Sequence, residues 1–365
     1  MKKIKLKGFS VKQLDAYIIK KFLGTYVFAI LLILAIIVMF DLNEKLDNFM
    51  KAPIMATIFD YYVNFLPYMA NQFSPLFTFI AVIFFTSKLA DNSEIIAILS
   101  SGVSFKRLLV PYMVSALAIA TFTFVLDAYI IPPANVKRID YQNKYVKNKA
   151  IDYGVNIQMQ VAPGEIAYMS RFDNRSKSAY NFSLEFFENK VLKSRMTATT
   201  AVYDTLYRWT VRNYMIRDFK GMKEEIRTGA SLDTIIPIEP RDFLIAENDH
   251  EKMTTPELKE YIDRQKARGV ANIKSFEIEY ERRFAMTGAA FILTLIGMSL
   301  SSRKVKSGMG INIGIGLVLS FSYILFSTVT STFAVSGYTS PMVAMWMPNL
   351  IYLVIGIVLY RRASV

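Results

Sequence analysis

Six long apolar segments, three before and three after a polar middle region, constrain the fold of this chain more than any other feature. They are Phe22–Phe40, Pro53–Ser87, Leu108–Ile131, Phe284–Ser302, Gly310–Phe333 and a last segment that begins within Met342–Pro348 and ends at Tyr360. A bilayer core is ~30 Å thick, so a helix needs about 20 apolar residues to cross it. Soluble chains do not carry six such runs together. The sequence therefore predicts an α-helical membrane protein with six transmembrane helices, arranged as three plus three.

The composition excludes several kinds of chemistry. The 365 residues include no Cys and one His, so disulfides, thiolate catalysis, iron–sulfur clusters and Cys-bound zinc are excluded. The chain also has no motif for a phosphate-binding loop, a serine hydrolase or a zinc protease. We therefore expect no cofactor, no metal and no enzymatic activity of the chain's own.

The distribution of charge predicts the orientation in the membrane. The net charge is +13, and most of the excess lies in residues 1–21, 86–109, 301–310 and the short tail after Tyr360. These four segments hold 15 basic and 3 acidic residues. Basic loops stay in the cytoplasm, so both termini are predicted to be cytoplasmic and the middle region extracytoplasmic. Residues 132–283 hold 26 basic and 22 acidic residues, a near balance that argues against a nucleic-acid partner.

The middle region has the pattern of β-structure. Residues 156–161 alternate polar and apolar side chains, and a Pro-Gly turn signal follows. Further strands are expected at 183–187, 190–197, 199–206, 207–219 and 231–238. These short strands predict an all-β, jellyroll-like domain of about eight strands between the third and fourth transmembrane helices, built as a sandwich or an open barrel. Its interior would be either a filled core or a space for acyl chains.

Two helices are expected after these strands. Thr254 and Glu257 have the spacing of a capping box, which predicts a helix over 257–268. Residues 272–283 are helical in pattern and lead directly into the fourth span.

A short amphipathic helix is also predicted in the loop between the second and third spans. Asp91 is placed to cap its start, and Gly102 is placed to end it. Ile95, Ile98 and Leu99 form one apolar stripe at helical spacing. The helix is either a connector on the membrane surface or an element that inserts into a groove of a cytoplasmic partner.

Asp60 and Asp127 are the acidic residues within the predicted spans. Ionisable residues inside a membrane are functional candidates. Both lie near the predicted outer ends of their helices, where a structural role at the interface competes with a functional one. His250 lies in an acidic loop, and we expect no catalytic role for it.

Four segments together resemble the LptF/LptG (YjgP/YjgQ) permease family. The run SEIIAILSSGVSFKRLL from Ser93 is similar to the coupling-helix segment of that family, and LDAYIIKKFLGTY over Leu14–Tyr26 resembles its opening. EYERRFA over Glu279–Ala285 and PNLIYLVIGIVLYRR over Pro348–Arg362 resemble its entry to the fourth span and its ending. The resemblance covers nearly the whole chain and agrees with the three-plus-three topology.

The resemblance implies a permease subunit of the ABC transporter that exports lipopolysaccharide. It implies a second LptF/LptG-type subunit, paired through the first and fifth helices around a lipid cavity, and a cytoplasmic ATPase dimer. It also implies an LptC/LptA-like periplasmic bridge and a location in the bacterial inner membrane. The domains would be 1–131 with the coupling helix near 91–102, then 132–270 in the periplasm, and 271–365.

The resemblance also assigns candidate residues. The ATPase contact would be formed by Ser93, Glu94, Ile95, Ile98, Leu99, Ser101 and Gly102. Candidates for the lipid cavity are Phe28, Leu32, Ile36, Phe40 and Lys45. Lys45 is the only cation between residues 41 and 47, so a headgroup with fewer phosphates, or cations from the paired subunit, would suit this stretch. Alternative functions are an ABC subunit for another lipid or for lipoproteins, and a membrane enzyme that modifies lipids.

Overall fold

The computed structural model describes residues 5–6, 9–10, 13–146, 153–221, 223–243, 249–267, 273–303 and 309–363. It divides into two compact units. The helical unit consists of residues 1–147, 252–255 and 274–365, and the sheet unit consists of residues 148–251 and 256–273. A two-residue hairpin, β1 (Lys5–Leu6) with β2 (Phe9–Ser10), precedes the first long helix.

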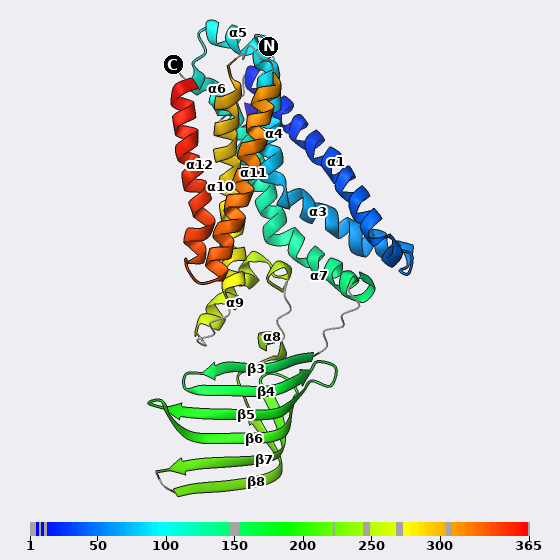
Figure 1. Ribbon diagram of the computed structural model, residues 1–365, viewed down its shortest axis with the longest axis vertical. Helices are drawn as coiled ribbons and strands as arrows, with labels where there is room; N and C mark the ends of the chain where they lie inside the picture. Colours follow the sequence, from blue (N-terminus) through cyan, green and yellow to red (C-terminus); the bar gives the residue numbers. More distant parts are fainter. Residues whose placement is uncertain are drawn as a thin grey trace. The chain divides into compact units, whose positions relative to one another are not determined.

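Within the helical unit, the predicted six membrane spans are confirmed. Among the residues that the structure describes, six helices are long and apolar enough to cross a membrane. The spans are built from α1 (Gln13–Phe49), α4 (Ser74–Asp91), α6 (Phe105–Val125), α10 (Lys274–Ser301), α11 (Met309–Val335) and α12 (Pro341–Ala363). Helices α4 and α10 pack against each other at the centre, and α1 diverges from the bundle along its length (Figure 1). The two chain ends lie at the same end of this unit, together with the short helix α5 (Glu94–Ser100).

The second apolar block is not one continuous helix. It contains α2 (Ile54–Ala56), a π-helical turn over Thr57–Tyr62 and α3 (Val63–Gln72), and a break at Phe73 separates these from α4. Pro75 lies in the first turn of α4, where a missing N–H is tolerated and where a helix begins more readily than it continues. Only α4 is a candidate span of this block, and α3 instead packs beside α7 (Ile131–Tyr141) (Figure 1).

The helix of the third span does not end at Ile131, where the apolar segment ends; the boundary of the span in the membrane stays a prediction. Helix α6 continues through a π-helical turn over Leu126–Ile130 into α7, and a second π-helical turn over Gln142–Val146 follows. Pro132 and Pro133 therefore lie in the first turn of a continuing helix. The wider turn before them breaks the regular hydrogen-bond ladder, so two residues without an N–H are accommodated there.

The sheet unit confirms the β-rich insertion between the third and fourth spans. Its strands are β3 (Tyr153–Ala162), β4 (Glu165–Asp173), β5 (Ser178–Glu188), β6 (Val191–Tyr203), β7 (Arg208–Lys220) and β8 (Lys223–Ile235). They form one antiparallel sheet in chain order, and the long strands curl along their length (Figure 1). The described residues of the sheet unit thus contain six strands in one meander, fewer than the about eight expected for a sandwich or an open barrel. The sequence pattern missed β4 and divided β6 in two.

One face of the sheet carries an apolar core around Trp209. Phe172 and Phe182 pack near its ring, and its indole N–H donates to the carbonyl of Ile238, 3.1 Å away. The segment after β8 continues into α8 (Pro240–Phe243), a 3-10 turn over Asp249–Lys252 and α9 (Thr255–Ala267). Helix α9 begins at Thr255, directly after the predicted cap Thr254 and two residues before the predicted start at Glu257. Arg268, where the predicted helix ends, is outside the described residues.

Candidate functional site

The short helix α5 is held between two turns at the end of the helical unit that carries both chain termini (Figure 1). Ser93 precedes it with a φ of 61°, and Gly102 follows it with a φ of 88°. Glycine suits the second turn because a side chain is unfavourable at positive φ. The predicted cap Asp91 is instead the last residue of α4, because the left-handed turn at Ser93 delays the start of α5 to Glu94.

The apolar stripe of α5 lies partly inside the unit. Ile95 is only 1% exposed and belongs to the core cluster that contains Phe22 and Leu108, and Ile98 packs against the same cluster. Ile96, which the sequence interpretation did not include, is 52% exposed, and Leu99 is exposed as well. Ile95 and Ile98 therefore anchor α5, while Ile96 and Leu99 form its outward apolar surface. The sequence could have identified Ile96 as part of this surface, because it lies three residues before Leu99.

Glu94 connects α5 to the start of α1. The Tyr17 hydroxyl donates to Glu94 Oε2 at 3.1 Å, and the Asn92 side chain donates to Glu94 Oε1 at 3.2 Å. Nearby, Arg107 at the start of α6 pairs with Asp15 of α1 at 2.5 Å. A displacement of α5 would therefore reach α1 through polar contacts as well as through the packing of Ile95.

Helices α1 and α11 expose most of their apolar surface. The four apolar cavity candidates of α1 are exposed, from 41% for Ile36 to 72% for Phe40. On α11, Val318 and Leu325 are similarly exposed. The described part of α11 carries no charged side chain. These two faces are suited to lipid or to another apolar helix.

Lys45 differs from the other cavity candidates because its charge is neutralised. Its ammonium pairs with Asp41 and donates to the Tyr61 hydroxyl at 2.8 Å. Tyr61 itself donates to Asp41 at 2.9 Å. The group is surrounded by an aromatic cluster formed by Phe49, Tyr61, Tyr62, Phe65, Tyr141 and Tyr145. In this arrangement Lys45 fastens the far end of α1 to the helices beside it; its role in lipid contact stays a prediction.

A groove of about 430 Å³ lies between α11, α10 and the junction of α3 with α4. Its wall combines apolar and hydroxyl-bearing side chains with one arginine, and it is lined by Phe73, Arg282, Met286, Ile324, Thr328 and Thr332, among others. A wall of this kind suits an acyl chain that ends in a polar group.

A polar junction lies close to this groove, where α10 meets the π-helical turn that follows α6. Arg283 is 2% exposed, and its Nε donates to Glu279 Oε1 at 3.0 Å. Glu279 also accepts two hydrogen bonds of 2.8 Å from Arg282. Arg282 in turn lies 3.7 Å from the carboxylate of Asp127. Asp127, a functional candidate from the sequence, is thus part of an inter-helix ion network, whereas Asp60 is exposed.

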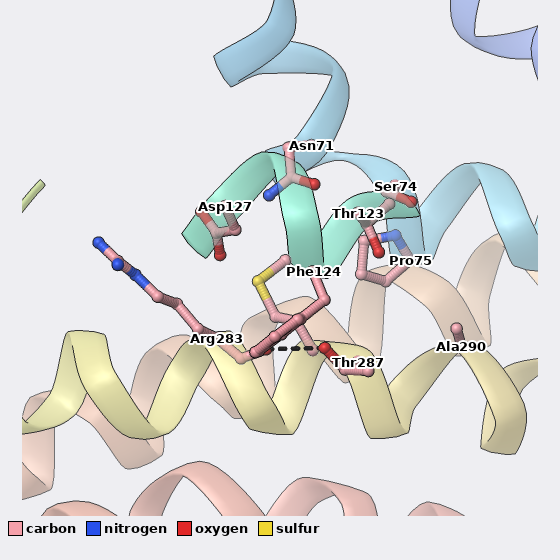
Figure 2. A pocket seen from close by; sticks show the side chains of 10 residues that line it. Asn71, Ser74, Pro75, Thr123, Phe124, Asp127, Arg283, Thr287 and Ala290 are labelled. Carbon is pink, nitrogen blue, oxygen red and sulfur yellow. Dashed lines mark hydrogen bonds between the residues drawn. The ribbon is translucent and has the colours of Figure 1, made fainter. Parts of the chain in front are cut away.

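A pocket of about 10 Å³ adjoins this network, just large enough for one water molecule. Figure 2 shows Asn71 and Asp127 on one side of it and Thr287 on α10 on the other. The Arg283 side chain extends away from Thr287 and Ala290 in this view. Among the described residues, no group of three or more His, Asp or Glu could hold a metal ion.

Comparison with known proteins identifies one family. The family model described as lipopolysaccharide export system permease LptF/LptG matches residues 16–362. A search of curated proteins finds no match.

Proposed function

The chain belongs to the LptF/LptG family of lipopolysaccharide export permeases, and from this premise we propose that it is a membrane subunit of an ABC transporter. It would extract lipopolysaccharide from the outer leaflet of the inner membrane and pass it to a periplasmic bridge of the LptC/LptA kind. The match over nearly the whole chain, on six apolar helices with an inserted sheet, is the observation that carries this proposal.

The charge distribution supports one orientation for this subunit. The short segments around the two chain ends and α5 hold the basic excess, so this end would face the cytoplasm. The sheet unit would then lie in the periplasm, where an LptC/LptA-like bridge can meet it. The same orientation would direct the groove and the polar junction toward the outer leaflet.

The energy for transport would come from a separate ATPase dimer, since the sequence has no nucleotide-binding motif. Helix α5 is its proposed docking element, with Glu94 as the polar contact and Ile96 and Leu99 as the apolar surface. Ser93, Ser101 and Gly102 would set the position of the helix. Because α5 is bonded to Tyr17 and anchored by Ile95, its displacement would move α1.

The exposed faces of α1 and α11 would form a lipid cavity together with a second LptF/LptG-type subunit. Each acyl CH₂ that leaves the bilayer must regain about 0.8 kcal/mol of apolar contact. Phe28, Leu32, Ile36 and Phe40 offer such contact from α1. These apolar contacts also agree with a subunit for another lipid, which is the second candidate.

The test replaces Glu94 with Lys in the complex purified with its ATPase and second subunit. Glu94→Lys should reduce ATPase association at least tenfold and abolish ATP-dependent lipid release. Tyr17→Phe removes only the internal bond to Glu94, and Arg362→Glu is a charge-reversal control at the same end. Normal release and complex yield in Glu94→Lys would refute the docking assignment. Mass spectrometry of the bound lipid would distinguish lipopolysaccharide from other lipids, and covalent change of that lipid by the chain alone would favour an enzyme.

A further inference from the structure

Between its two stretches in the sheet unit, residues 148–251 and 256–273, the chain belongs to the helical unit over residues 252–255. Residues 253–255 of this stretch are called here the return segment. It precedes the body of α9 and contacts α10 within the helical unit. These contacts with α10 lie within the helical unit, directly before the chain enters the sheet unit again at Pro256.

Arg283 of α10 holds this return segment directly. Its Nη1 donates to the Thr255 hydroxyl at 2.9 Å, and its Nη2 donates to the Met253 carbonyl at 3.0 Å. With the bond from Nε to Glu279, three nitrogens of one buried guanidinium have acceptors. The planar fork of arginine satisfies all three at once, which the single ammonium of lysine does not.

Glu279 extends the contact across the helices. It accepts hydrogen bonds from Arg283 and Arg282, and Arg282 faces Asp127 on the π-helical turn between α6 and α7. Helix α7 is where the chain leaves toward the sheet unit. One network thus joins α10, the π-helical turn that leads into α7 and the return segment, all within the helical unit.

The same network reaches the groove wall, because Arg282 and Met286 line the groove. Buried ion networks add little stability compared with apolar packing of equal volume. Such a network is therefore explained better by the fixed arrangement that it gives the helices than by a gain in stability. The four charged groups, two arginines and two carboxylates, hold α10, the π-helical turn after α6 and the return segment in one relative arrangement.

We propose that Arg283 is a positioning residue that couples the inserted domain to the transport helices. It fixes the return segment to α10, so that a movement of α10 during the transport cycle changes the placement of the sheet unit, and the reverse. The inference rests on the proposed function only for the source of that movement, which is nucleotide hydrolysis in the ATPase.

The absence of Cys from the sequence allows a direct measurement. Spin labels are attached to Glu260→Cys on α9 and Met342→Cys on α12, both exposed positions. Their distance is measured by pulsed electron paramagnetic resonance in the full complex, without nucleotide and with ATP and vanadate. We expect a nucleotide-dependent shift in the otherwise wild-type protein.

The variants are Arg283→Met, Arg283→Lys and Thr255→Val. Arg283→Met should lose at least half of the shift and reduce lipid release several-fold, while ATP hydrolysis continues. Arg283→Lys should be intermediate, and Thr255→Val, which removes one acceptor, should broaden the distance distribution. Thr287→Val is the matched control, because that hydroxyl bonds to the Arg283 carbonyl on its own helix and not to the return segment.

Wild-type behaviour of Arg283→Met in both the distance shift and lipid release would overturn the proposal. So would a distance that does not respond to nucleotide in the otherwise wild-type complex. If Arg283→Met does not assemble into the complex, the test is made with Thr255→Val. An unchanged distance distribution in Thr255→Val would then overturn the proposal. Failure of the proposed function is separate, since it would appear as no ATP-dependent lipid release by the wild-type complex.

Discussion

Helices α1 and α4 show opposite relations between apolarity and burial. The apolar stretch of α1 has the highest mean hydropathy of the six spans and is 11% buried, whereas that of α4 has the lowest and is 72% buried. In a membrane the lipid-facing surface must be apolar, while close helix packing favours small and hydroxyl-bearing residues. In the sheet unit, by contrast, large apolar side chains form the interior, because Trp209 and Phe172 are fully buried there. Hydropathy therefore identifies spans but does not identify the core.

The contrast between α1 and α4 predicts the largest effect on stability at Phe79, a fully buried residue of α4. Phe79→Ala should lower the free energy of unfolding by about 3–5 kcal/mol, because it leaves a cavity in packed surroundings. Phe40→Ala on α1 removes the same group from an exposed position and should leave stability nearly unchanged. Unfolding in mixed micelles measures both. Equal losses for the two variants would show that burial does not separate these helices.

Two glycines, one on α10 and one on α11, test the same contrast with a smaller expected change in stability but with opposite signs. A Cβ at Gly297 would lie 2.8 Å from Val82 Cγ1 on α4, while a Cβ at Gly314 of α11 meets nothing within 4 Å. Gly297→Ala should therefore destabilise the protein by about 1–3 kcal/mol through overpacking. Gly314→Ala should be neutral or stabilising by up to about 1 kcal/mol, because alanine is the better helix former. Thermal unfolding of the two variants side by side checks the predicted difference in sign.

The smallest effect concerns pH and the sheet unit. Burial, and next the carboxylates of Asp242 and Asp249, raise the pKa of Tyr261 to about 12. The folded state favours the neutral phenol of Tyr261. Its contribution to stability is therefore fully present below pH ~10, which is the pKa of tyrosine in the unfolded chain. That contribution is lost as the pH rises through the folded pKa. Stability between pH 10 and 12 should fall more gently in Tyr261→Phe than in the wild type. Parallel curves would show that Tyr261 does not ionise on unfolding.

Much of the fold follows from local patterns in the sequence. The six spans required only segment length and apolarity, and the turn that ends α5 required Gly102, which has a positive φ. The break at Phe73 and the continuation through Pro132 were not predicted, although prolines mark both places. A proline limits the local hydrogen bonds, but packing against other helices decides whether the chain breaks or continues.

The candidate site was less predictable. The spacing of Ile95, Ile98 and Leu99 identified a helix face, yet Ile95 turns into the core and Ile96 turns outward. The contacts of Arg283 with the return segment join residues 28 to 30 positions apart. No periodicity in the sequence indicates a bond of that kind.

The sequence by itself determined that this chain crosses a membrane six times, that a β-rich domain is inserted after the third span, and which family it belongs to. These properties depend on segment length, local alternation and short motifs, which are readable along the chain. Only the tertiary structure decided which spans are buried, that Lys45 is neutralised by Asp41, and that Arg283 holds the return segment. Those properties depend on which distant side chains meet, because burial and charge pairing are set by neighbours in space.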